Sequence, residues 1–193
     1  MALTESYMLP LGTLAPDFLL PNVVSGKQST LESLKGSKGT LVIFMCNHCP
    51  YVLHLMDALV SSVNSLAEKD INTIAISSNS IHSHPQDGPE EMMKLSLEKS
   101  FLFPYLYDET QEVAHLYRAA CTPDFYLFDA DTKLAYRGRY DSSRPGNEIS
   151  TTGEDLHKAA EMILLKKPIT EIQFPSMGCN IKWHQGNNPK EHL

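Results

Sequence analysis

The chain is poor in positive charge. It has 16 Lys and Arg against 23 Asp and Glu, which gives a formal net charge of −7 at pH 7. Nucleic acids and anionic membranes bind clustered positive surface, so we expect neither as a partner. No run of about 18 apolar residues occurs, as a transmembrane helix requires. Residues 1–8 also lack the basic and apolar segments of a secretory signal, so we expect a cytoplasmic protein.

Cysteine is also scarce, with four in 193 residues. This is too few for a secreted scaffold held together by disulfides. The composition is otherwise ordinary, with 42% hydrophobic and 20% charged residues, and the length fits one globular domain. We therefore expect a single domain over 1–193, with 168–193 as a C-terminal extension packed on it. The sequence makes no prediction of the oligomeric state.

Two apolar runs of strand length flank an amphipathic segment. Residues 40–45 and 71–76 are predominantly apolar, as expected of strands covered on both faces. Between them Pro50 stands at a favoured first helical position. Apolar residues then recur at helical spacing, at Val52, Leu55, Met56, Leu59, Val63, Leu66 and Ala67. These segments predict a strand–helix–strand unit.

The remaining segments predict a larger α/β sheet. A hairpin is expected within 17–29, and a loop over 81–89 that could overhang an active site. A helix should follow from about Glu90, and another over 109–119. Two strands, 124–129 and 134–140, form a hairpin. The last helix should begin at Thr152 as N-cap, with Asp155 as its capping-box partner.

Cys46-Asn47-His48-Cys49 lies between the first strand and the helix at Pro50. A C-x-x-C pair can close a disulfide, and unpaired N–H groups at a helix N-terminus stabilise a thiolate. Because Cys49 directly precedes Pro50, we predict Cys49 as the attacking sulfur and Cys46 as its resolving partner. His48 could favour the thiolate or move protons, or it could be a solvated loop histidine.

A metal centre is the main structural alternative. Cys46, His48 and Cys49 could supply zinc ligands, but a closed zinc site needs more, and Cys121 and Cys179 are isolated in sequence. Attached haem requires a histidine after the second cysteine. We therefore expect no metal and no cofactor, with a non-catalytic redox-sensing or zinc-binding module as the alternative.

Four segments carry longer motifs. They are L-G-T-L-A-P-D-F at 11–18, V-I-F-M-C-N-H-C-P-Y-V at 42–52, F-P-Y-L-Y-D at 103–108 and C-T-P-D-F-Y-L-F-D at 121–129. Together they resemble the peroxiredoxin-like branch (redoxin, AhpC/TSA type) of the thioredoxin-like superfamily. The resemblance implies an α/β thioredoxin-like fold with a central mixed sheet flanked by helices, an N-terminal β-hairpin and a C-terminal extension. It also implies a cis-proline loop facing the reactive cysteine, which Thr122 and Pro123 match.

The sequence departs from both parts of this superfamily. The fifth residue after Phe44 is Cys49, the place of a thioredoxin nucleophile, and Val52 then stands where a second cysteine is usual. Against the peroxiredoxin pattern P-x-x-x-T/S-x-x-C, Cys46 takes the hydroxyl position and Val42 that of the proline. Candidates for the peroxiredoxin arginine are Arg118, Arg137, Arg139 and Arg144, none on a clear match.

We predict a thiol–disulfide oxidoreductase with a role in cell redox homeostasis. Its redox-active disulfide would join Cys46 and Cys49. A protein or small-molecule disulfide would oxidise the two thiols, and an external thiol would reduce the disulfide again. The alternative is an antioxidant thiol peroxidase, in which Cys49 attacks peroxide and Cys46 condenses with the sulfenic acid. Cys121 could exchange disulfides with Cys49 or be a buried apolar residue, and Cys179 could be a resolving thiol if the C-terminal segment folds back.

Overall fold

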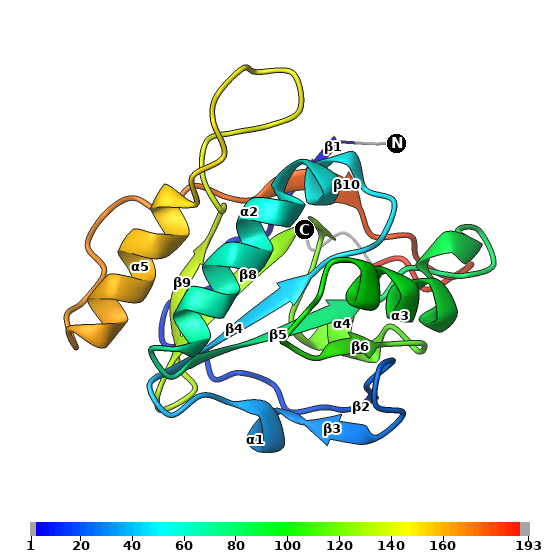
Figure 1. The fold of residues 1–193 in the computed structure, drawn as a ribbon, viewed down its shortest axis with the longest axis horizontal. Helices are drawn as coiled ribbons and strands as arrows, with labels where there is room; N and C mark the ends of the chain where they lie inside the picture. The colour runs from blue at the N-terminus through cyan, green and yellow to red at the C-terminus, as the bar shows by residue number, and fades with distance from the viewer. Residues whose placement is uncertain (1–2, 190–193) are drawn as a thin grey trace.

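The computed structural model describes residues 3–189, which contain a five-stranded mixed sheet (Figure 1). The strand order is β6-β5-β4-β8-β9. The strands are β4 (Gly39–Phe44), β5 (Ile71–Ser77), β6 (Tyr105–Tyr107), β8 (Asp124–Asp129) and β9 (Leu134–Gly138). β4, β5 and β6 are parallel, whereas β8 pairs antiparallel with both β4 and β9. The predicted strands and hairpin are confirmed, and β4 is buried over its whole length.

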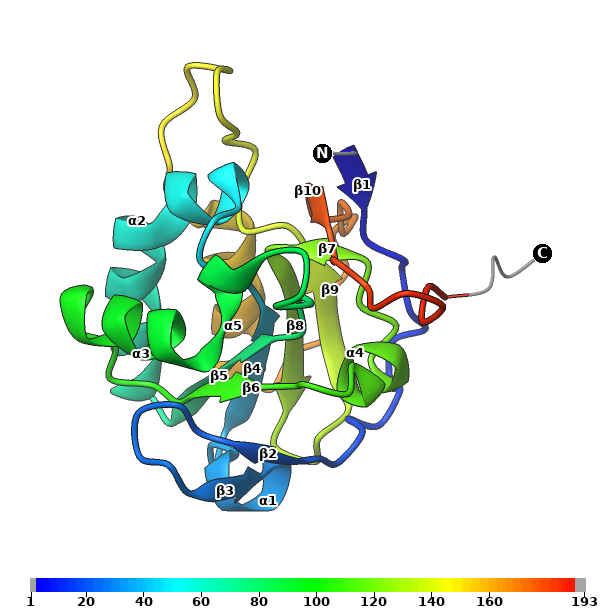
Figure 2. The same ribbon diagram turned by 90° about the vertical axis from the view of Figure 1, so that its right-hand side faces the viewer.

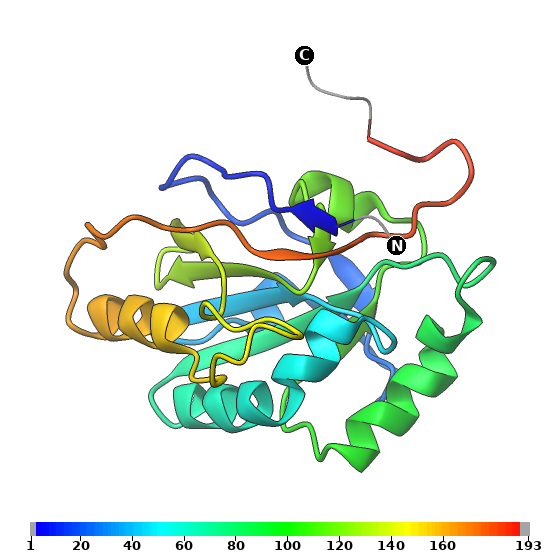
Figure 3. The ribbon, with the colours of Figure 1, turned by 90° about the horizontal axis from the view of Figure 1, so that it is seen from above.

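Helices cover both faces of this sheet (Figure 3). They are α1 (Leu31–Leu34), α2 (Pro50–Ala67), α3 (Pro89–Glu98), α4 (Glu112–Leu116) and α5 (Glu154–Leu164), with a 3-10 turn η1 (Pro85–Asp87). Alternate β4 side chains point to opposite faces. Leu41 and Ile43 pack with α2, α3 and α5, whereas Val42 and Phe44 pack with α1 and α4. The predicted thioredoxin-like α/β architecture is therefore confirmed.

The two predictions of local structure at the N-terminal hairpin and at the start of α5 have different outcomes. The N-terminal hairpin is confirmed, because β2 (Leu19–Pro21) pairs antiparallel with β3 (Gln28–Thr30).

The predicted capping box at α5 is wrong, since the N-cap is Gly153, in a left-handed conformation with φ 68°. The Asp141 carboxylate accepts the N–H groups of Thr152 and Gly153, both at 2.7 Å. A carboxylate from the preceding loop therefore binds this end of the helix.

Segments from the N-terminal and C-terminal parts of the chain pair in a separate sheet (Figure 2). Its order is β1-β10-β7, with β1 (Leu3–Glu5), β10 (Met177–Asn180) and β7 (Cys121–Thr122), all antiparallel. Part of the predicted extension 168–193 thus packs on the middle of the chain. The single domain over 1–193 stays a prediction, because residues 190–193 lie outside the described part. Within residues 3–189 no helix has the length and apolar character needed to cross a membrane.

Candidate active site

The predicted cysteine pair lies where β4 leads into α2. Cys49 is the N-cap residue of α2 and Pro50 its first helical residue, as predicted. Proline suits this position because the first N–H groups of a helix have no partner within the helix. Both sulfurs lie in the core between the sheet and α2, and the exposed fractions of Cys46 and Cys49 are only 1% and 0%. A substrate therefore reaches them only if the covering segments move.

The loop opposite the cysteines begins with a cis peptide bond. This bond joins Thr122 to Pro123, as the resemblance implied. The Thr122 carbonyl oxygen lies 3.0 Å from Cys49 Sγ, and its hydroxyl lies 3.5 Å from Cys46 Sγ. When Cys49 carries its proton, the thiol donates to this carbonyl. Thr122 thus contacts both sulfurs, and the structure brings four predicted site residues together.

The two thiols differ in their affinity for a proton. The hydrogen bond from Cys46 lowers the pKa of Cys49 below its ordinary value, against the effect of burial, and the Thr122 hydroxyl and the Val52 amide lower it further. The same hydrogen bond raises the pKa of Cys46, with burial and the negative charge of Asp87 adding to the effect. The arrangement thus favours a Cys49 thiolate that accepts a hydrogen bond from the Cys46 thiol.

We expect the ultraviolet absorbance of the reduced protein to show one thiolate forming at a pH well below 9. A lowered pKa means that Cys49 loses its proton first as the pH rises, while Cys46 holds its own to a higher pH. The step should vanish in Cys49→Ser and persist in Cys121→Ser. A midpoint at or above 9 would mean that the hydrogen bond from Cys49 to the Thr122 carbonyl dominates instead.

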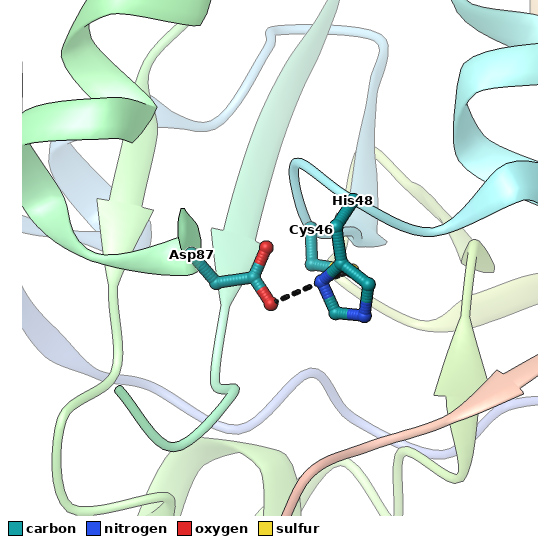
Figure 4. A group of neighbouring side chains, drawn as sticks. All are labelled: Cys46, His48 and Asp87. Carbon is teal, nitrogen blue, oxygen red and sulfur yellow. Dashed lines mark hydrogen bonds and ion pairs between the residues drawn. The ribbon is translucent and has the colours of Figure 1, made fainter. Parts of the chain in front are cut away.

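His48 is held by a buried carboxylate. Figure 4 shows the Asp87 side chain pointing at the His48 ring, and Asp87 Oδ2 lies 2.6 Å from Nδ1. Asp87 is fully buried and also accepts from the Asn47 backbone N–H at 2.9 Å and the Asn79 amide at 2.8 Å. The same Nδ1 lies 3.8 Å from Cys46 Sγ. His48 is therefore a fixed neighbour of Cys46, not a solvated loop histidine.

Asp87 was not predicted from the sequence. It lies in η1, within the loop over 81–89 that was expected to overhang the site. A solitary acidic residue in a polar loop carries no signal of its own. Its role depends on a contact with His48 that only the folded chain provides.

Cys46, His48 and Asp87 could in principle hold a metal ion, because their ligand atoms lie within 4.8 Å of one another. Two nitrogen or oxygen ligands of one tetrahedral zinc lie about 3.3 Å apart, given zinc–ligand bonds of about 2.0 Å. The 2.6 Å between His48 and Asp87 is a hydrogen-bond distance. The arrangement is therefore a hydrogen-bonded network, and its third member is Asp87, where the zinc alternative considered from the sequence had Cys49.

The other two cysteines lie on opposite sides of the β7–β10 pair. Cys179 stands opposite Thr122 in the register and belongs to the same buried cluster as Cys46 and Cys49. The Cys121 thiol instead donates to the Pro123 carbonyl at 3.7 Å. The structure therefore adds Cys179 to the cysteine pair, whereas a redox role for Cys121 stays a prediction.

The four candidate arginines have partners elsewhere. Arg137 pairs with Asp124, Arg139 with Asp155 at 2.6 Å, Arg144 donates to Met177 Sδ at 3.2 Å, and Arg118 lies 6.0 Å from the centroid of the Tyr7 ring. Within residues 3–189, none of the hydrogen bonds of these arginines goes to Cys46 or Cys49. In the described part of the chain, none of these four guanidinium groups thus donates to the cysteine that would attack a peroxide.

Comparison with known proteins identifies a family and several chains of similar sequence and fold. The sequence model of the AhpC/TSA family matches residues 11–137. An uncharacterized conserved protein from Geobacillus kaustophilus is similar, with 49% identity over 95% of this chain and 97% of the other, and a TM-score of 0.93. A hypothetical protein from Sinorhizobium meliloti 1021 is 40% identical over 95% and 100%, with a TM-score of 0.92.

A more distant structure shares the fold. The thioredoxin domain of a thiol-disulfide oxidoreductase from Bacteroides vulgatus is 18% identical over 78% of this chain and 98% of its own, with a TM-score of 0.58. The comparison with curated proteins gave no match.

Proposed function

Because the chain belongs to the AhpC/TSA family, we propose that it is a thiol–disulfide oxidoreductase with Cys49 as nucleophile and Cys46 as resolving thiol. Thiol-based redox chemistry is common to the family. The observation that carries the finer assignment is the position of Cys49 as the N-cap residue of α2, where the first N–H groups of the helix have no partner within it. It gives Cys49, at the start of α2 and against Thr122, the thiolate that attack requires.

The reaction has two exchange steps. The Cys49 thiolate attacks one sulfur of the substrate disulfide, which leaves a mixed disulfide and releases the other sulfur as a thiolate. The Cys49 sulfur then no longer accepts the Cys46 proton, so the largest cause of the raised Cys46 pKa disappears. Cys46 can ionise, attack Cys49 and release the second substrate thiol. An external thiol reduces the resulting Cys46–Cys49 disulfide.

His48 and Asp87 act on the second step. The Nδ1–H group of His48 donates a hydrogen bond to the Asp87 carboxylate. This hydrogen bond holds the ring so that Nδ1 lies 3.8 Å from Cys46 Sγ. As negative charge develops on Cys46, this N–H can turn toward the sulfur and stabilise it. We therefore assign His48 and Asp87 as positioning residues. The same chemistry in the cytoplasm would serve redox homeostasis, with no need for nucleic acid, membrane or cofactor.

Peroxide reduction is the second candidate, favoured by the complete burial of Cys49, since a small oxidant needs less opening of the site. Against it stands the engagement of all four candidate arginines elsewhere. Cleavage of the O–O bond develops charge that preplaced donors must stabilise.

A direct comparison of oxidants tests the proposal. The fully reduced protein is mixed with oxidised glutathione, insulin or hydrogen peroxide, and the rate of Cys49 oxidation is followed by quenching with an alkylating agent. We expect both disulfides to oxidise Cys49 faster than peroxide at equal concentration. A faster reaction with peroxide, accompanied by a sulfenic acid on Cys49, would replace the proposal with the peroxidase.

A further inference from the structure

The backbone beside the cis-proline already has a strand paired with it. In thioredoxin-like proteins the residue before this proline can pair with an extended substrate chain, as strands add to an open sheet edge. Here β10 takes that place, with Cys179 opposite Thr122 and Asn180 opposite Cys121. Figure 2 shows β10 lying along β7 at this end of the molecule. A segment of the chain itself thus occupies the substrate edge.

The register directs the Cys179 side chain toward the active site. Directly opposed residues of an antiparallel pair project to the same face, and their neighbours project to the other. The Thr122 hydroxyl is within 3.5 Å of Cys46 Sγ, so this face is the one that meets the cysteine pair. Cys179 lies on it, in the same buried cluster as Cys46 and Cys49, whereas Cys121 belongs to the opposite face.

Cys179 lies close enough to Cys49 for the two thiols to influence each other's proton affinity. Its hydrogen bond to Cys49 helps lower the Cys49 pKa. Burial and this hydrogen bond raise the pKa of Cys179 to about 11, so it remains the proton donor. Cys49 therefore has two thiols as neighbours, Cys46 from its own loop and Cys179 from β10.

The close approach of β10 depends on Gly178. A Cβ atom built on this residue would lie 2.0 Å from the Thr122 carbonyl oxygen, so any side chain would push β10 away from β7. On its other edge β10 pairs with β1, where Gly178 faces Thr4 and Cys179 faces Leu3. Strands on both sides thus fix the place of Cys179.

We propose that Cys179 is an internal exchange partner of Cys49, so that the oxidised site partitions between a Cys46–Cys49 and a Cys49–Cys179 disulfide. This inference rests on the proposed function. Starting from Cys46–Cys49, Cys179 gives its proton to solvent and its thiolate attacks Cys49 Sγ. The Cys49–Cys179 bond forms, the Cys46–Cys49 bond breaks, and Cys46 leaves as a thiolate that takes up a proton. No electrons are gained or lost.

The exchange has a consequence for substrates. A Cys49–Cys179 disulfide ties β10 to α2 across Thr122 and keeps the edge closed to an extended chain. The freed Cys46 thiol can attack Cys49 again and reverse the step. The oxidised site therefore has two forms. The Cys49–Cys179 disulfide keeps the β7 edge closed, whereas the Cys46–Cys49 disulfide leaves β10 free to move away from it.

Disulfide mapping tests this proposal. Reduced wild type, Cys46→Ser and Cys121→Ser are treated with oxidised glutathione, alkylated and digested, and the crosslinked peptides are identified by mass spectrometry. We expect both disulfides in wild type and in Cys121→Ser, and Cys49–Cys179 as the product in Cys46→Ser. Wild type that contains Cys46–Cys49 alone, or folded Cys46→Ser that retains glutathione on Cys49 without a crosslink, would overturn the proposal.

Gly178→Ala gives an independent measurement. It should reduce the Cys49–Cys179 fraction severalfold relative to wild type and leave Cys46–Cys49 formation intact. An unchanged fraction in this variant would contradict the role of the β10 contact. The proposed function itself has a separate test, since a wild type in which Cys49 takes part in no disulfide at all would refute it.

Discussion

Replacing Cys49 with serine should lower the rate of disulfide reduction by at least about a thousandfold, because a hydroxyl is a far weaker nucleophile than a thiolate. No other described thiol combines the N-cap position of α2 with a lowered pKa. The Cys46→Ser/Cys179→Ser double variant should lose multiple turnover but still react once. Its Cys49 should then hold a stable mixed disulfide, since both neighbouring thiols that could resolve it are gone.

Insulin reduction under single-turnover and multiple-turnover conditions, with mass spectrometry of the trapped species, checks both expectations. Cys121→Ser is the matched control, because Cys121 is equally buried in the neighbouring strand but donates to Pro123. Full activity of Cys49→Ser would remove Cys49 from the mechanism. A mixed disulfide trapped on Cys46 in Cys49→Ser would show that the order of attack is the reverse.

The parts of the fold that sequence predicts well are those with local causes. β4 and β5 are predominantly apolar segments of strand length, and α2 has an apolar stripe that begins just after a proline, so each element is specified within its own residues. The start of α5 was mispredicted because the N–H groups of Thr152 and the N-cap Gly153 bind Asp141, a residue outside the helix. A side chain from another segment can replace a capping box, and sequence spacing does not reveal it.

The same distinction applies to the site. The position of Cys49 follows from its neighbours Phe44 and Pro50, and the cis-proline follows from the family resemblance. Asp87 could not be found this way, because its contact with His48 joins two separate loops. Cys179 reaches Cys49 only because β10 pairs between β1 and β7, three short strands from distant parts of the chain. Such pairing depends on the whole fold and leaves little periodic signal in the sequence.

Replacing Asp124 with alanine should cost about 3–5 kcal/mol of unfolding free energy, because it leaves the Arg137 guanidinium buried without its counter-ion. Both side chains of this pair are fully buried. Arg137 Nη2 donates to Asp124 Oδ2 at 2.9 Å, Nη1 contacts Oδ1, and the guanidinium carbon lies 3.8 Å from the Tyr126 ring centroid. Chemical denaturation of wild type and variant measures the difference.

The partly exposed pair Arg139–Asp155 is the matched control, with side chains 24% and 27% exposed. Solvent screens such a pair, so Asp155→Ala should cost about 1 kcal/mol or less. Asp124→Leu combined with Arg137→Met should recover most of the loss, since apolar residues of similar size remove both charges together. If Asp124→Ala were no more destabilising than Asp155→Ala, the Arg137 charge would have to find water or another acceptor. Because Asp124 directly follows Pro123, the variant's disulfide exchange rate would then show whether that rearrangement reaches the loop opposite Cys49.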